Sequence, residues 1–242
     1  MSRIKNWLKA EFINGQTKFD WWFLAIGILV QIAAIVYTCL NPDGMSNSVI
    51  FWTSVSGLTG IIAVVLCAQG KLSFYVFGFI QLFTYVFAVA IPERLWGEVG
   101  ENVFYFITMI IGVVIWIKHY RTKEDGSTSV KSKLLSKNGW FISLVILFAS
   151  TVVLALVLAK TSDPLPWFDS ITTTAPFIAQ IFLMLGYKEQ WAFWIVEDIL
   201  SLIMFAILGN WIMIIQYAFW TVNCIYGWIK WERLAATSHE EM

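Results

Sequence analysis

The stretch KEQWAFWIVEDILSLIMF, residues Lys188 to Phe205, decides the class of fold. Most of it is apolar enough for a lipid bilayer, yet two adjacent carboxylates, Glu197 and Asp198, lie in its middle and two tryptophans precede them. A carboxylate near the centre of a membrane-spanning helix costs roughly 2.5–3.5 kcal/mol on insertion scales. If the surroundings are a membrane, these acids need a specific partner or ligand.

The composition indicates a membrane protein. The chain has 242 residues, of which 59% are hydrophobic and 13% are charged. An ordinary soluble domain contains roughly 25% charged residues, and several apolar runs approach or reach the ~20 residues that a helical span needs. The net charge of zero gives no sign of nucleic-acid binding. We therefore predict an all-α polytopic membrane protein.

Eight hydrophobic segments are predicted to be transmembrane helices. They are Trp21–Leu40, Val49–Ala68, Leu72–Ile91, Val103–Ile117, Trp140–Ala159, Ile171–Tyr187, Trp191–Leu208 and Trp211–Ile229. Short turns join most of them, such as NPDG at Asn41–Gly44 and GN at Gly209–Asn210. The long polar stretch His119–Gly139 is predicted to be a linker with an amphipathic end near Leu134 and Leu135. Before the first span, Ile4, Trp7, Leu8 and Phe12 form the pattern of a short interfacial helix.

The distribution of Lys and Arg predicts the orientation in the membrane. With eight spans, all 16 basic residues except Arg94 and Lys160 fall on the side that carries both termini. Cytoplasmic loops hold an excess of basic residues, so both termini are predicted to be cytoplasmic. The opposite face carries the acidic residues Asp43, Glu93, Glu98, Glu101, Asp163 and Asp169.

Segments two to four resemble segments six to eight. At an offset of 117 residues, the matched pairs are Lys71 with Lys188, Phe74 with Trp191, Phe77 with Trp194 and Gln81 with Asp198. At an offset of 112, Tyr105 matches Tyr217, and the WIK triplet Trp116–Lys118 matches the WIK triplet Trp228–Lys230. The first helix of each copy enters the membrane from the same side, so the repeats are predicted to be parallel. Transporters built from parallel repeats bind substrate near the midplane between the halves.

The predicted organisation is an extra N-terminal helix followed by three helices, one inverter helix and three more helices. Its parts are residues 1–48 with the N-terminal cytoplasmic segment and the extra helix, 49–118 with the first three-helix repeat, 119–160 with the cytoplasmic linker and the inverter, 161–231 with the second repeat, and 232–242 with a cytoplasmic tail.

The candidate site begins with Trp191, Trp194 and Asp198. Their spacing of three and four residues places them within an arc of about 60° on one helix face, while Glu197 points about 100° away from Asp198. This arc suits a flat, cationic or electron-poor ring stacked on Trp, with a polar group that reaches the acid. We expect Asp198 to face the substrate, and Glu197 to face a neighbouring helix or a side chain that supports the site without touching the substrate. The alternative is an interfacial tryptophan belt, with Asp198 paired to a buried polar side chain.

Other polar residues in or beside the spans are candidates for the same cavity. They are Gln81, Asn102, Tyr105, Gln216, Tyr217 and Asn223. Hydrogen bonding between helices is an equal alternative for each of them. The sequence has no HExxH, serine elbow or P-loop motif, and the cysteines lack metal-ligand spacing. We predict no catalytic residue, metal or cofactor, although a membrane-embedded enzyme using Glu197 and Asp198 stays open as an alternative.

The octapeptide WAFWIVED, Trp191–Asp198, resembles the W-x-x-W-x-x-x-N/D motif of the PnuC vitamin transporters. The arrangement of three, one and three helices is similar to theirs and to that of the SWEET sugar transporters. The resemblance covers about Val49–Trp231 and implies that Trp191, Trp194 and Asp198 bind the substrate.

The resemblance also implies facilitated diffusion of nicotinamide riboside through a bacterial inner membrane, trapping by a cytoplasmic nicotinamide riboside kinase, and a homotrimer. Related members carry thiamine or riboflavin. Coupling to protons or sodium ions, with Glu197 as the ion site, stays open as an alternative.

Overall fold

The structure is a computed structural model that describes residues 2–42, 46–92, 94, 96–122, 126–161, 163–209 and 211–239. The predicted turn residues Asp43, Gly44 and Asn210, and the acidic residue Glu93, lie outside the described residues. The chain forms two compact units, Met1–Lys131 and Ser132–Met242, and each is described by itself. The boundary between them falls inside the predicted linker.

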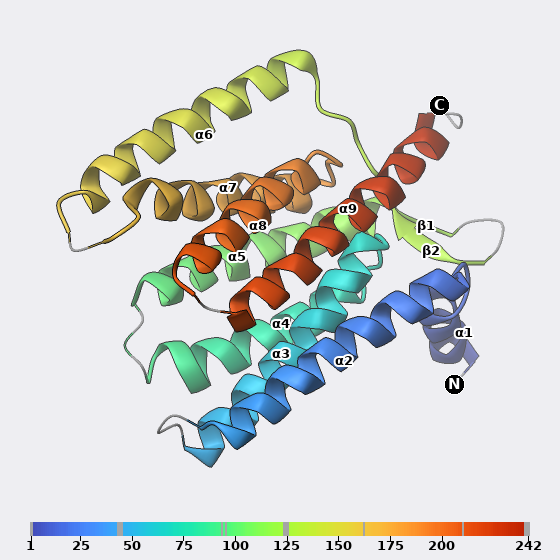
Figure 1. Cartoon of the computed structure of the whole chain (residues 1–242). Helices are drawn as coiled ribbons and strands as arrows, with labels where there is room; N and C mark the ends of the chain where they lie inside the picture. Colours follow the sequence, from blue (N-terminus) through green and yellow to red (C-terminus); the bar gives the residue numbers. More distant parts are fainter. Residues whose placement is uncertain are drawn as a thin grey trace. The chain divides into compact units, whose positions relative to one another are not determined.

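The first unit is a helical bundle with a small hairpin. Its elements are α1 (Ser2–Phe12), α2 (Lys18–Leu40), α3 (Asn47–Ala68), α4 (Phe74–Tyr85), the π-helix η1 (Val86–Ala90), α5 (Trp96–His119), β1 (Tyr120–Thr122) and β2 (Thr128–Val130). Helix α2 packs on α3, α3 on α4, and η1 on both α3 and α5 (Figure 1). Thr17 and Asp20 form a capping box that starts α2.

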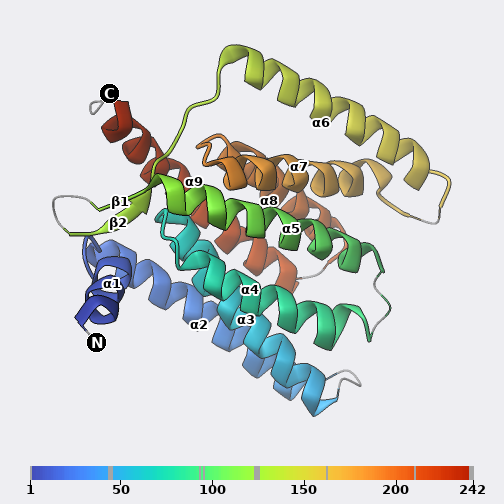
Figure 2. The ribbon, with the colours of Figure 1, turned by 180° about the vertical axis from the view of Figure 1, so that it is seen from behind.

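The second unit contains α6 (Lys137–Leu158), α7 (Pro166–Leu185), α8 (Gln190–Ile207) and α9 (Trp211–His239). Each helix packs on the next one in the chain (Figure 2). A buried apolar cluster joins Ile178, Ala179 and Phe182 of α7 to Phe193 of α8. Trp140 of α6 stacks on Phe193 with ring centroids 5.9 Å apart, so the cluster fixes α6, α7 and α8 together.

Each of the eight predicted spans coincides with helical structure. Among the described residues, six helices are long and apolar enough to cross a membrane, namely α2, α3, the part of α5 from Glu98, α6, α7 and α8. The other two predicted spans correspond to the shorter apolar stretch Phe74–Ala90 and to α9. The prediction of long apolar helices is therefore confirmed, and the count of eight spans stays a prediction.

A buried glutamate holds α1 against the hairpin. Glu11 is fully buried, and its carboxylate accepts hydrogen bonds from the Ser73 amide at 2.7 Å, the Thr128 hydroxyl at 2.8 Å and the Tyr120 hydroxyl at 2.5 Å. Burial and the nearby Glu11 carboxylate raise the pKa of Tyr120 above its ordinary value, which keeps its phenol a donor. The predicted N-terminal helix is confirmed as α1, and the exposed Trp7 lies on it.

The predicted linker is more structured than its polar composition suggests. Strands β1 and β2 pair antiparallel, with Tyr120 opposite Val130. The residues between β2 and α6 are not helical, and the predicted amphipathic end near Leu134 and Leu135 stays a prediction. The backbone of Lys133 donates to Gly186 at 2.9 Å and accepts from Lys188 at 3.0 Å. These two bonds tie the end of the linker to the turn between α7 and α8.

The turns before α4 and α8 have the same hydrogen bonds, which sets the register of the repeat. The amides of Gly70 and Lys71 donate to Cys67 and Leu66 at 2.9 and 3.0 Å, and the amides of Gly186 and Tyr187 donate to Leu183 and Phe182 at 3.1 and 2.9 Å. Gly70 and Gly186 both have a positive φ, of 69° and 78°, which favours glycine after a helix. Gly70 is therefore equivalent to Gly186, and the predicted pairing of Lys71 with Lys188 is wrong by one residue.

This register changes the pairs that were expected between the two units. Tyr75 of α4 becomes the equivalent of Trp191, and Gln81 becomes the equivalent of Glu197 rather than of Asp198. The backbone hydrogen bonds at the starts of α4 and α8 agree with this register. The Tyr75 amide donates to the Leu72 carbonyl, and the Trp191 amide donates to the Lys188 carbonyl.

Candidate functional site

Trp191 is a packing residue between α8 and α9. Its side chain is buried, and the ring lies so close to Gly227 that an added Cβ there would be 2.6 Å from the ring carbons. The ring also meets Trp231 edge-on, with centroids 6.1 Å apart and an interplanar angle of 76°. The lack of a side chain at Gly227 is what lets the indole lie against α9.

The first unit repeats this arrangement with other residues. Tyr75 lies against Gly112, where an added Cβ would be 2.3 Å from the phenol oxygen, and it meets Trp116 edge-on at 5.3 Å. Gly112 is thus equivalent to Gly227 and Trp116 to Trp231. The predicted match between the WIK triplets, which pairs Trp116 with Trp228, is therefore wrong by three residues.

We expect Gly227→Ala to destabilise the protein by about 1–3 kcal/mol, because the new methyl group must displace the buried indole. Thermal unfolding of the purified protein measures this effect as a lower midpoint. Gly100→Ala is the matched control, since a Cβ at Gly100 meets nothing within 4 Å and alanine favours the helix. Equal midpoints for Gly227→Ala and the unaltered protein would contradict the packing role of Trp191.

Trp194 has different neighbours from Trp191. It is partly buried and packs against the cluster of Ile178, Ala179, Phe182 and Phe193. The structure therefore places one motif tryptophan against α9 and the other against the cluster shared by α7 and α8. Trp194 is thus less buried than Trp191.

The two acids also have different partners. Asp198 is buried and accepts a hydrogen bond from the Cys224 thiol of α9 at 3.0 Å. Glu197 is buried as well and accepts a hydrogen bond from Ser201 of its own helix at 2.9 Å. Glu197 was expected to face a neighbouring helix or a supporting side chain, and Ser201 is such a side chain. Which of the two acids faces the substrate stays a prediction.

Other candidates of the second unit lie on α9. Asn223 is buried beside Cys224 in the sequence, and Gln216 is partly buried. The Tyr217 ring stacks on Phe205 of α8 at 5.4 Å. The structure thus brings Asp198 and the Cys224–Asn223 region together, and it places Tyr217 against the other end of α8.

Candidates of the first unit bond mainly within their own helix. Asn102 donates to the Glu98 carbonyl at 2.8 Å, and the Tyr105 hydroxyl donates to Glu101 at 2.6 Å. Gln81 is partly buried, and its side chain passes Gly60 of α3. The printed bonds of Asn102 and Tyr105 lie within α5, whereas the alternative to binding was hydrogen bonding between helices. Both that alternative and a role in binding stay predictions.

Two buried residues of the site were not predicted. Gln190 is fully buried, and neither atom of its amide has a hydrogen-bond partner among the residues that the structure describes. The cysteines were considered only as metal ligands, yet the Cys224 thiol donates to Asp198. The signal for Gln190 was its position four residues before Trp194, on the same side of α8.

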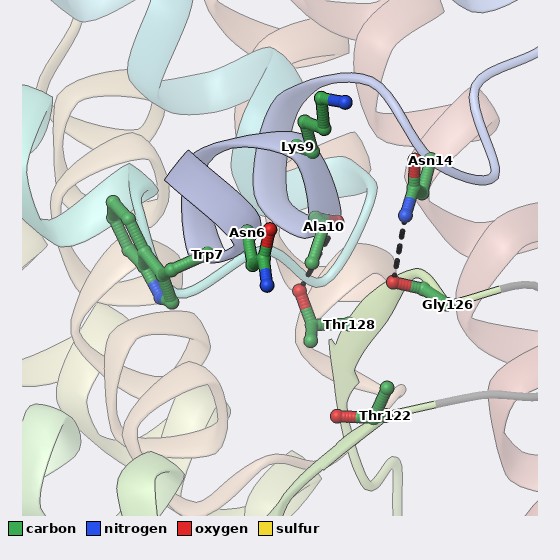
Figure 3. Close-up of a pocket in the computed structure, with 8 residues that line it drawn as sticks. All are labelled: Asn6, Trp7, Lys9, Ala10, Asn14, Thr122, Gly126 and Thr128. Carbon is green, nitrogen blue, oxygen red and sulfur yellow. Dashed lines mark hydrogen bonds between the residues drawn. The ribbon is translucent and has the colours of Figure 1, made fainter. Parts of the chain in front are cut away.

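A hollow of about 400 Å³ lies elsewhere, between α1 and the hairpin (Figure 3). It is lined by Asn6, Trp7, Lys9, Ala10, Asn14, Thr122, Gly126 and Thr128. Asn14 donates to the Gly126 carbonyl at 3.0 Å across one edge of it. None of the predicted site residues lines this hollow.

Comparison with known proteins agrees with the motif on α8. Residues 50–233 match the family described as nicotinamide mononucleotide transporter. A nicotinamide riboside transporter PnuC from Haemophilus influenzae is 33% identical over 229 residues, covering 94% of this chain and 95% of the relative. The chain belongs to the PnuC family.

Other PnuC proteins are similar over nearly the same length. A nicotinamide riboside transporter PnuC from Neisseria mucosa is 30% identical over 238 residues, covering 94% of this chain and 86% of the relative. A crystal structure of the vitamin B3 transporter PnuC superposes with a TM-score of 0.76 at 30% identity, over 96% of this chain and 98% of that one. This PnuC chain is accordingly a multi-pass membrane transporter.

Proposed function

We propose that this chain carries nicotinamide riboside across the membrane. The observation that carries the proposal is the buried pair of acids beside a partly exposed tryptophan on α8, in a chain whose relatives over nearly their whole length are named nicotinamide riboside transporters. The same motif was expected from the sequence to bind a flat, cationic or electron-poor ring.

The chemistry of the substrate fits these residues. Nicotinamide riboside has a flat pyridinium ring with a positive charge, which favours stacking on the Trp194 indole. The hydroxyl groups of its ribose can donate hydrogen bonds to the carboxylates of Asp198 and Glu197. Acids are costly at membrane depth unless a partner offsets the cost, and a cationic substrate is such a partner.

The test of the substrate is the heat stability of the purified protein with each candidate vitamin. A ligand that binds only the folded state stabilises it in proportion to the logarithm of its concentration over Kd. We expect nicotinamide riboside to raise the unfolding midpoint, and thiamine and riboflavin at the same concentration to leave it unchanged. A shift with thiamine or riboflavin alone would transfer the proposal to that vitamin.

We further propose that transport is facilitated diffusion, and that a cytoplasmic kinase traps the substrate by phosphorylation. The proposal is supported by the positions of the two acids, since Asp198 bonds to Cys224 and Glu197 to Ser201, and no chain of titratable groups crossing the membrane was evident from the sequence.

We expect uptake into kinase-free liposomes to stop when the inside concentration equals the outside one. The measurement is uptake of labelled nicotinamide riboside with proton and sodium gradients imposed in turn. Accumulation above the outside concentration in either gradient would show coupling and would make Glu197 with Ser201 the candidate ion site.

We also propose the wider architecture that was expected from the sequence. The chain has eight spans in an arrangement of one, three, one and three helices, with parallel repeats, both termini in the cytoplasm and a place in the bacterial inner membrane. The matched turns at Gly70 and Gly186 and the matched pairs Tyr75–Gly112 and Trp191–Gly227 support the repeat. The assembly is a homotrimer, which native mass spectrometry of the purified protein tests.

A further inference from the structure

Gln190 is a buried amide with unmet hydrogen-bonding capacity. Its side chain has no exposed area, and neither the nitrogen nor the oxygen of its amide has a partner among the described residues. The large majority of buried side-chain polar atoms in proteins are hydrogen-bonded, and an unpaired one destabilises the folded state. An amide that carries this cost beside the substrate motif points to a ligand group that completes its bonds.

Gln190 lies in one row with the residues that were assigned to the substrate. Gln190, Trp194 and Asp198 are spaced by four residues each along α8, so each is one turn from the next on the same side of the helix. Each step advances by about 6 Å along the axis and turns by about 40°. The row therefore offers an amide, an indole and a carboxylate in that order.

The order of these groups matches the order of groups in nicotinamide riboside. The ring that stacks on Trp194 carries a carboxamide on one side and the ribose on the other. With the ribose toward Asp198, the carboxamide points toward Gln190. Two carboxamides can exchange a pair of hydrogen bonds, because each has an N–H donor and a carbonyl acceptor.

We propose that Gln190 recognises the carboxamide of the substrate and makes the transporter select nicotinamide riboside over the corresponding nicotinic acid riboside. This inference rests on the proposed function of the chain. The acid analogue lacks the N–H donor from which the Gln190 oxygen accepts, and its carboxylate adds a negative charge to a site that already holds two acids. A site built to hydrogen-bond a substrate group rejects the analogue that leaves a buried partner unpaired.

The experiment compares three ligands on the full-length protein by calorimetry: nicotinamide riboside, nicotinic acid riboside and the pyridinium riboside without the carboxamide. We expect the unaltered protein to prefer nicotinamide riboside by about tenfold or more over each analogue. Gln190→Met keeps the length of the side chain and removes both hydrogen-bonding atoms. It should lower the affinity for nicotinamide riboside by about tenfold and bring the three ligands to within about threefold of each other.

Gln180→Met is the matched control, because Gln180 is also a buried glutamine of the second unit but lies on α7. It should keep the full preference for the carboxamide, whatever its effect on stability. If Gln190→Met does not fold, Gln190→Glu takes its place. Its carboxylate still accepts from the carboxamide N–H and repels a substrate carboxylate, so it should increase the preference for nicotinamide riboside over nicotinic acid riboside.

The outcomes separate the two proposals. If the unaltered protein binds nicotinamide riboside and the Gln190 variants keep the same preference, the role of Gln190 is wrong and the proposed function stands. The role of Gln190 is equally wrong if the unaltered protein binds the three ligands alike. If the unaltered protein binds none of the three ligands, the proposed function fails and the role of Gln190 fails with it.

Discussion

Trp194→Ala is expected to lower the affinity for nicotinamide riboside by about 30- to 100-fold while the protein still inserts and assembles. A desolvated cation–π contact contributes about 2 kcal/mol or more, and the variant also loses the apolar area of the ring. The side chain is partly buried at the edge of the cluster around Phe182 and Phe193, so its removal leaves most of that cluster in place. Calorimetric titration of the purified variant measures the change.

Two further tryptophan variants show whether the effect belongs to stacking. Trp167→Ala removes an exposed indole from the first turn of α7 and should leave binding unchanged. Trp191→Ala empties the space against Gly227 and Trp231 and should lower the unfolding midpoint more than Trp194→Ala does. Normal binding by Trp194→Ala would place this residue in the lipid-facing belt.

The helices could be located from sequence, and the hairpin could not. Each apolar run was long enough to show its helix without any knowledge of its neighbours. Strands β1 and β2 have three residues each, which is too short for a periodic pattern to appear. The hairpin also depends on Glu11, whose bonds to Tyr120 and Thr128 join residues more than a hundred positions apart.

The register of the repeat was misjudged because similar residues have different roles in the two units. The Lys71 ammonium donates to the Ala10 carbonyl, whereas Lys188 pairs with Glu232 and lies over Trp228. The equivalent positions are those where an aromatic ring needs a glycine on the facing helix. The aromatic ring differs between the two units, and the glycine lies on a separate helix. An alignment that matches identical residues therefore does not find these positions.

The helix geometry predicted which residues of the site share a face, but not which partners they meet. A turn of about 100° per residue was enough to group Trp191, Trp194 and Asp198. It could not show that Trp191 is held by α9 or that Cys224 donates to Asp198, because both contacts depend on how α9 packs. Nor could it show that Gln190 is buried with no hydrogen-bond partner for its amide among the described residues.

The bond between Cys224 and Asp198 leads to the second large effect. Asp198→Ala should lower the affinity for nicotinamide riboside by about 30-fold or more, because it removes an acid that bonds the substrate and leaves the Cys224 thiol without its acceptor. Asp198→Asn should stay within about tenfold of the unaltered protein, since an amide oxygen still accepts from the thiol and from a ribose hydroxyl. Binding is measured by calorimetric titration and folding by the unfolding midpoint.

Cys224→Ala and Glu197→Gln distinguish residues that contact the substrate from residues that hold α8 and α9 together. Cys224→Ala keeps the acid but removes the donor on α9, so we expect a loss of affinity of no more than about fivefold. Glu197→Gln can still accept from Ser201, and it should change binding less than Asp198→Ala does. If Glu197→Gln abolishes binding in a folded protein while Asp198→Ala binds normally, the ribose meets Glu197, and the substrate lies on the side of α8 that Gln190, Glu197 and Ser201 share.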